Sequence, residues 1–104
     1  MPRVAFVLKL KPGQVEAYRR THQAVWPEMI EANRQAGVRN HTMFLYGNLA
    51  FGYLECDDYA KTQELLARSD VVTRWGELHA EIIDPDPATG RLGMELLEEV
   101  FHQD

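Results

Sequence analysis

Tyr18 and His22 are the two side chains whose chemistry and spacing first indicate a functional site. They lie four residues apart, so a helix projects both from one face. Val15 and Trp26 extend that face by one turn in each direction. A hydroxyl and an imidazole on an apolar face both need hydrogen-bond partners. The face therefore either packs into a core that satisfies them or borders a pocket, and the residues alone leave both interpretations open.

The pair suits general acid–base catalysis. An imidazole with an ordinary pKa near ~6.5 can take up or release a proton at neutral pH. A tyrosine hydroxyl, with an ordinary pKa near ~10, serves better as a hydrogen-bond donor beside it. On spacing alone, a histidine such as His22 is more often a partly buried residue with satisfied hydrogen bonds than a catalyst, and Tyr18 could be a core tyrosine.

The helix that carries the pair is expected to break at Trp26-Pro27. A residue before proline is biased away from the helical region, and Pro27 suits the first position of a second helix, expected over residues 27–36. The break would place His22 near the end of an element, where clefts form. Trp26 is interpreted as a structural wedge beside the proline.

The remaining segments predict an α+β domain. Residues 4–10 alternate as a strand does, and residues 40–46 and 49–56 flank the two-residue turn Gly47-Asn48. Further elements are expected in this order: helices over residues 59–67 and 71–83, a loop over residues 84–90 and a strand over residues 95–102. This order, βαββαβ with the second helix split, is that of a ferredoxin-like domain.

The predicted hairpin has two apolar faces. One carries Phe44, Phe51 and Tyr53, and the other carries Met43 and Leu54. The helices of so short a chain can cover only one face of the sheet. Because aromatic residues are enriched in the centres of interfaces, we expect the aromatic face to form a homodimer contact.

Composition excludes several classes of protein. The 104 residues predict one domain, residues 1–104. A net charge of -5 argues against nucleic acid and anionic membranes as partners. The single cysteine, Cys56, excludes an intrachain disulfide and fits a reducing compartment. No apolar run approaches the ~20 residues of a spanning helix, and no signal peptide is evident. We therefore expect a cytoplasmic protein.

The spacing of Tyr18, His22 and Trp26-Pro27-Glu28 resembles the principal helix of the L-rhamnose mutarotases, small dimeric α+β-barrel proteins that interconvert sugar anomers. The similarity runs nearly end to end. The other segments that carry it are Ala5-Phe6-Val7, Gly37, Asn40, Ser69-Asp70-Val71, Arg74-Trp75, Asp84-Pro85-Asp86 and Glu99-Val100-Phe101.

The resemblance implies a function and a site. His22 would transfer the proton, Tyr18 and Trp75 would line a monosaccharide pocket, and neither a cofactor nor a metal would be needed. His41 stands where the family has a tyrosine that is expected to touch the sugar, so it either binds the sugar or is an ordinary strand residue. Gly76 stands in place of a second tryptophan. The substrate is therefore expected to be L-rhamnose or a related deoxyhexose such as L-fucose.

Two other functions share this fold. Cofactor-dependent small monooxygenases also use dimeric α+β barrels, and a non-catalytic metabolite-binding module could have the same shape. The fold does not choose between these functions. The sequence of this chain favours the mutarotase because of its resemblance to that family.

Overall fold

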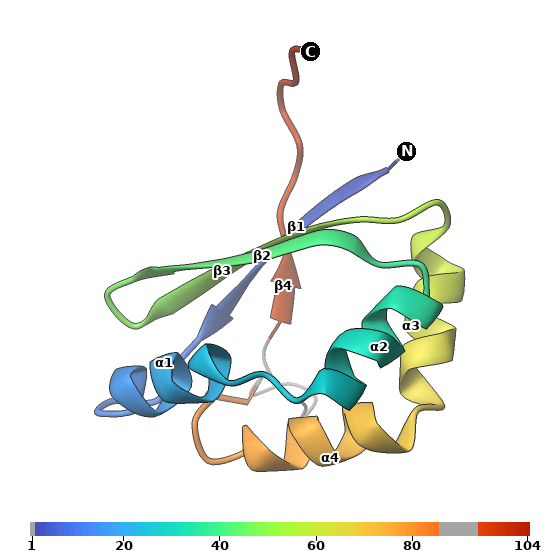
Figure 1. Ribbon diagram of the computed structural model, residues 1–104. Coiled ribbons are helices and arrows are strands. Elements are labelled where there is room, and N and C mark those ends of the chain that lie inside the picture. Colours follow the sequence, from blue (N-terminus) through green and yellow to red (C-terminus); the bar gives the residue numbers. More distant parts are fainter. Residues whose placement is uncertain (1, 86–93) are drawn as a thin grey trace.

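The computed structural model describes residues 2–85 and 94–104 and contains one antiparallel sheet with its helices on one face (Figure 1). The strands lie in the order β2-β3-β1-β4, so the ferredoxin-like α+β prediction is confirmed. In chain order the elements are β1 (Arg3–Lys9), α1 (Val15–Gln23), α2 (Pro27–Gln35), β2 (Arg39–Tyr46), β3 (Leu49–Glu55), α3 (Tyr59–Ala67), α4 (Asp70–Leu78) and β4 (Met94–Leu96).

Helix boundaries follow from local chemistry. Trp26 takes an extended conformation (φ -57°, ψ 132°) and Pro27 opens α2, so the predicted break is observed. Asp58 caps α3 by accepting a hydrogen bond from the backbone of Lys61 at 3.2 Å, and the Ser69 hydroxyl caps α4 in the same way. In the part of the chain that the structure describes, no helix is long and apolar enough to cross a membrane.

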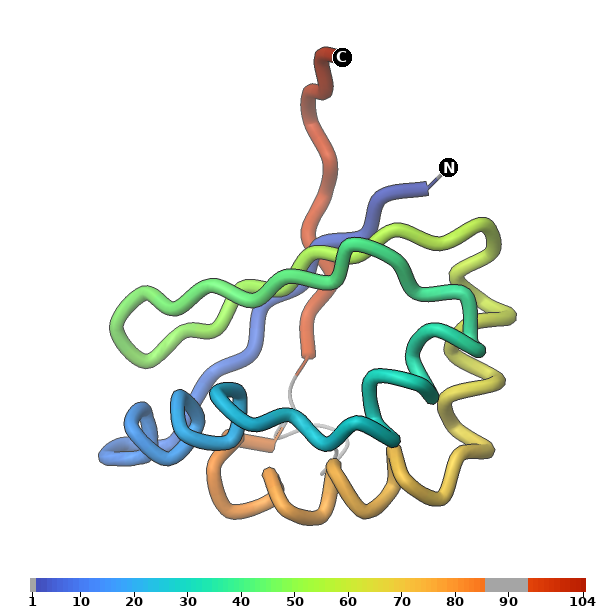
Figure 2. The backbone as a smooth tube through the Cα atoms, viewed as in Figure 1, coloured from blue at the N-terminus to red at the C-terminus, as the bar shows by residue number. Residues whose placement is uncertain are grey.

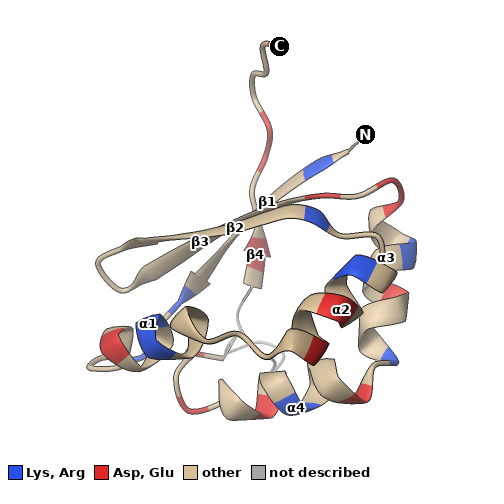
Figure 3. Ribbon diagram, in the orientation of Figure 1, with Lys and Arg blue, Asp and Glu red and all other residues tan. Residues whose placement is uncertain are grey.

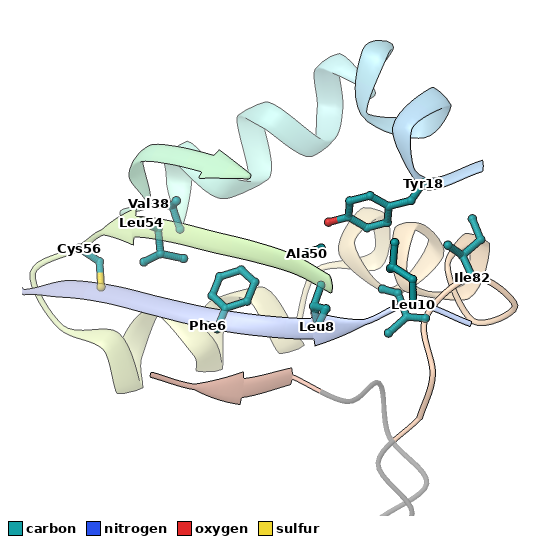
Figure 4. Packing of buried hydrophobic residues seen from close by; sticks show 10 residues of the cluster. Phe6, Leu8, Leu10, Tyr18, Val38, Ala50, Leu54, Cys56 and Ile82 are labelled. Atoms are coloured by element: carbon teal, nitrogen blue, oxygen red, sulfur yellow. The ribbon is translucent and has the colours of Figure 1, made fainter. Parts of the chain in front are cut away.

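The hairpin has the predicted register. Phe44 pairs with Phe51 and Met43 with Gly52 across the turn, where Gly47 adopts a left-handed φ of 59°. Side chains of the face turned toward the helices form the core, together with residues of α1 and of the segment after α4 (Figure 4). Its buried members are Phe6, Leu8, Leu10, Tyr18, Val38, Ala50, Leu54, Cys56, Ile82 and Ile83.

The opposite face of the sheet lacks a covering layer within residues 2–85 and 94–104. Phe44 is 60% exposed and Tyr46 is 77% exposed. The middle of β2 and β3 carries no charged residue (Figure 3). After β4 the chain runs away from the helices, beyond the sheet, with Val100 and Phe101 exposed (Figure 2). This side of the protomer therefore presents apolar surface.

Two predicted elements end several residues earlier than expected. Helix α4 ends at Leu78 rather than near Ile83, because the chain turns back and Ile83 forms a bridge to Leu10. The last strand covers Met94–Leu96 rather than residues 95–102, since the backbone bond from Leu97 to Ala5 is the last one to β1. The loop expected over residues 84–90 lies outside the described residues from residue 86 onward.

Gly52 is required where the ring of Phe6 crosses β3. A Cβ at Gly52 would lie 2.1 Å from Cζ of Phe6, far inside van der Waals contact. We expect Gly52→Ala to lower the free energy of unfolding by about 1–3 kcal/mol, because the buried ring must move. Urea denaturation followed by circular dichroism measures this change.

Gly76→Ala is the matched control, because a Cβ at Gly76 meets no atom within 4 Å. Gly76 lies inside α4, where alanine is the better helix former, so this variant should gain up to ~1 kcal/mol. Equal stability changes in the two variants would contradict the role assigned to Gly52.

Candidate active site

A cavity of about 460 Å³ lies between the inner face of the sheet and the helices. It adjoins a second space of about 840 Å³. Cavities of this size are typical of small-molecule sites. Six residues line both spaces: His22, Met29, Asn33, His41, Met43 and Trp75.

The structure brings Tyr18 and His22 together on the cavity wall, as their spacing on α1 predicts. Their rings stack with centroids 4.2 Å apart and planes inclined by 24°. Tyr18 is only 3% exposed, and its ring lies near Leu10 of the core (Figure 4). Burial raises the pKa of Tyr18 to about 12. Its hydroxyl therefore stays protonated at neutral pH and is able to donate a hydrogen bond.

His22 is held through one ring nitrogen. Its Nδ1 lies 3.0 Å from the carbonyl oxygen of Tyr18 and 3.0 Å from Oγ1 of Thr21. Burial lowers the pKa of His22; the bond to the Tyr18 carbonyl opposes this shift, and the neighbouring His79 adds to it. The imidazole is therefore neutral at pH 7. A neutral imidazole on a cavity wall can accept a proton from a ligand.

Trp75 of α4 lies beside His22 on the cavity wall. Its ring centroid is 5.7 Å from that of His22, with the planes inclined by 73°, and 4.7 Å from that of His79. Trp26 contacts Trp75 edge to face at 5.0 Å. Trp75 therefore lines the cavity itself, while Trp26 packs against it.

His41 reaches the same cavity because of an irregularity in β2. The register of β2 against β3 shifts beside Asn40, which takes a left-handed φ of 51°. Such a bulge redirects the side chains around it. The ring of His41 lies 6.4 Å from that of Phe6 and keeps exposed surface. Burial of the rest of the ring by protein atoms is the main cause that lowers the pKa of His41. The charge of His22 lowers it further.

Sequence reasoning missed Thr21, which contacts His22, and His79, which contacts Thr21. His79 is 2% exposed; its Nδ1 lies 2.9 Å from the carbonyl oxygen of Trp75, and its Nε2 lies 2.8 Å from Oγ1 of Thr21. Trp75 and His79 lie four residues apart, so the sequence places them on one helix face, but this spacing alone does not identify His79 as part of a site. Nothing in the sequence links His79 to Thr21, because 58 residues separate them.

The remaining cavity wall is mainly apolar. Gly76 lines it with no atom in the way of a side chain, and Asn33 and Gln63 add polar groups that sequence reasoning also missed. Among residues 2–85 and 94–104, no three histidine, cysteine or acidic side chains converge as metal ligands do. The site therefore combines a neutral imidazole, a buried phenol and an indole beside it.

The profile of the L-rhamnose mutarotase family matches residues 3–103. The chain belongs to this family. The L-rhamnose mutarotase of Listeria monocytogenes serotype 4b is 34% identical over 104 residues, which cover 98% of each chain. The crystal structure of the L-rhamnose mutarotase of Formosa agariphila superposes with a TM-score of 0.84 at 28% identity, over 100% of both chains.

Family membership determines the class of reaction. The protein is a sugar mutarotase, an isomerase that interconverts the α and β anomers of a sugar. Neither the small monooxygenase nor the metabolite-binding module is favoured by these relatives. Tetracenomycin F2 cyclase of Streptomyces glaucescens superposes with a TM-score of 0.61 at 18% identity, over 100% of this chain and 98% of that one, which shows the fold alone.

Proposed function

We propose that this mutarotase acts on L-rhamnose or a related deoxyhexose such as L-fucose, with His22 as the proton-transferring residue. The observation that carries the proposal is the geometry of His22. One nitrogen of its ring is held by Tyr18 and Thr21, while the ring lines the cavity. The relatives' names supply the sugar, since those relatives are L-rhamnose mutarotases.

The proposed reaction needs only proton transfers. Nε2 of His22 removes the proton from the anomeric hydroxyl, the bond between C1 and the ring oxygen breaks, and its electron pair stays on the ring oxygen. The imidazolium of His22 then gives the proton to that oxygen. The aldehyde rotates about its bond to C2, and the reverse steps close the ring on the other face. Tyr18 donates a hydrogen bond to the same region.

The sugar is held by two kinds of contact. The indole of Trp75 offers a flat apolar surface to the C–H side of the ring. His41 and Asn33, which line the same cavity, address the hydroxyls. His41 thus takes the position of a sugar-binding residue, and no cofactor or metal takes part in the proposed steps.

Anomer-exchange NMR on a panel of aldoses tests the proposal. We expect saturation transfer between the two anomeric protons to be accelerated most for L-rhamnose or L-fucose. A protein that accelerates exchange of other aldoses but of neither of these two would contradict the substrate assignment and leave the reaction class in place.

Gly76 is expected to set sugar preference. Gly76→Trp would place a large ring at a cavity wall that is open in this chain. Because a group that only shapes a pocket changes discrimination by about 10–200-fold, the ratio of L-rhamnose to L-fucose exchange rates should change by that order. Gly76→Ala, which adds one methyl group, is the control. An unchanged ratio in Gly76→Trp would contradict this description of the pocket.

The proposed assembly is a homodimer of single-domain protomers, residues 1–104, that pack the exposed aromatic face of each sheet against the other. Phe44 and Phe51 pair on that face, and Tyr53 extends it along β3. A two-fold axis makes such a patch complementary to itself. A cytoplasmic location agrees with the single free cysteine and the acidic composition. Neither nucleic acid nor a membrane is proposed as a partner.

A further inference from the structure

We propose that Thr21 and His79 are positioning residues that hold His22 in the tautomer with its proton on Nδ1, so that Nε2 faces the reaction as the acceptor. The inference rests on the proposed role of His22. It assigns these two residues a role that acts through His22. Their role follows from which atoms can donate and which can only accept.

The position of the ring hydrogen of His79 can be assigned first. Its Nδ1 lies 2.9 Å from the carbonyl oxygen of Trp75, and a carbonyl only accepts, so Nδ1 carries the hydrogen. Burial lowers the pKa of His79, and the bond to that carbonyl only partly opposes the shift. The ring is therefore neutral at pH 7 and has one N–H. Its other nitrogen, Nε2, must accept a hydrogen bond.

Thr21 supplies that hydrogen bond. Its Oγ1 lies 2.8 Å from Nε2 of His79, 2.9 Å from the carbonyl oxygen of Tyr18 and 3.0 Å from Nδ1 of His22. The hydroxyl has one proton for these three neighbours. Among the described residues, Nε2 of His79 has no other partner, and it is buried. Because an unpaired buried acceptor is costly, the proton of Thr21 goes to His79.

These contacts favour one tautomer of His22, the one with the hydrogen on Nδ1. With its proton given to His79, Thr21 can only accept from Nδ1 of His22, and the carbonyl of Tyr18 can only accept as well. Nδ1 therefore carries the hydrogen, and Nε2 keeps its lone pair. When Nε2 takes the sugar's proton, Nδ1–H still has both acceptors, so the imidazolium is held in the same orientation.

Histidine tautomers can be measured directly by two-bond ¹H–¹⁵N correlation NMR on the ¹⁵N-histidine-labelled full-length protein, with His22 assigned by its loss in His22→Gln. We expect the Nδ1–H form for both His22 and His79 at neutral pH. His79→Phe keeps a ring but frees the proton of Thr21, and it should raise the Nε2–H fraction of His22. A wild-type His22 in the Nε2–H form would overturn the proposal.

Measurements of kcat and KM distinguish a positioning role of the Thr21 hydroxyl from a packing role of its side chain. Thr21→Val keeps the branched shape and removes the hydroxyl; it should lower kcat about tenfold and change KM by less than about twofold. Thr21→Ser restores the hydroxyl without the methyl group and should recover kcat to within about twofold. An active Thr21→Val with an impaired Thr21→Ser would show that Thr21 acts through packing and would overturn the proposal.

The two proposals can fail separately. If His22→Ala exchanges anomers at the unmodified rate, the catalytic assignment of His22 fails, whatever tautomer the ring adopts. If His22→Ala is inactive and wild-type His22 is found in the Nε2–H form, the catalytic assignment stands and the positioning role of Thr21 and His79 is wrong.

Discussion

His22→Ala is expected to slow anomer exchange by about 10²–10⁴-fold while sugar binding changes far less. The imidazole is neutral at pH 7, lies on the cavity wall and is held through Nδ1, so its loss removes the proposed proton carrier. Loss of the proton carrier mainly raises the free energy of the transition state and affects the bound sugar much less. Saturation-transfer NMR of the two anomeric protons, at matched enzyme and sugar concentrations, measures the rate.

Two variants of the same pair serve as controls. His22→Gln keeps a hydrogen-bonding side chain but cannot carry a proton at neutral pH, so it should rescue little of the rate. Tyr18→Phe removes a donor and keeps the proton carrier, so it should cost less than His22→Ala. An unmodified exchange rate in His22→Ala would remove His22 from the mechanism.

Phe51→Lys is expected to convert the proposed dimer into monomers or aggregates. Phe51 pairs with Phe44 on the face of the sheet that the helices leave uncovered, and in the proposed dimer it lies in the interface. A lysine there would bury a charge without a partner, which costs about 3–5 kcal/mol, enough to shift the dissociation constant by roughly 10²–10³-fold or more. Analytical ultracentrifugation over a range of concentrations reports the change.

Leu65→Lys is the matched control for the interface. Leu65 is 38% exposed on α3, on the helical side of the protomer, so the same substitution there should leave the dimer intact. Circular dichroism confirms that both variants are folded before they are compared. A folded Phe51→Lys protein that remains fully dimeric would exclude this face as the interface.

Elements bounded by local chemistry were predictable from the sequence. The break before Pro27 follows from the steric effect of proline on the residue before it. Helix α3 begins and ends where predicted, and the Asp58 side chain satisfies a backbone group at its start. Hairpin register followed from the turn at Gly47, whose left-handed conformation a glycine adopts without strain.

Elements bounded by distant contacts were not predictable. Apolar spacing continues from α4 to Ile83, but the helix ends at Leu78, and after a turn the chain bonds to Lys9 and Lys11 at the end of β1. The last strand likewise stops where its bonds to β1 stop, although it was expected to continue to residue 102. In both cases the boundary depends on contacts with a segment that is distant in the sequence, and no local pattern encodes those contacts.

The residues of the site also fall into those that the sequence could predict and those that only the tertiary structure brings together. The sequence by itself determined that Tyr18 and His22 share a helix face, because positions four apart on a helix are neighbours. Its resemblance to a family pointed to Trp75 and His41. Only the tertiary structure placed these residues around one cavity and put Thr21 between His22 and His79. That last contact joins α1 to the end of α4, and the packing of the two helices against the sheet, rather than any spacing along the chain, decides which hydroxyl meets which imidazole.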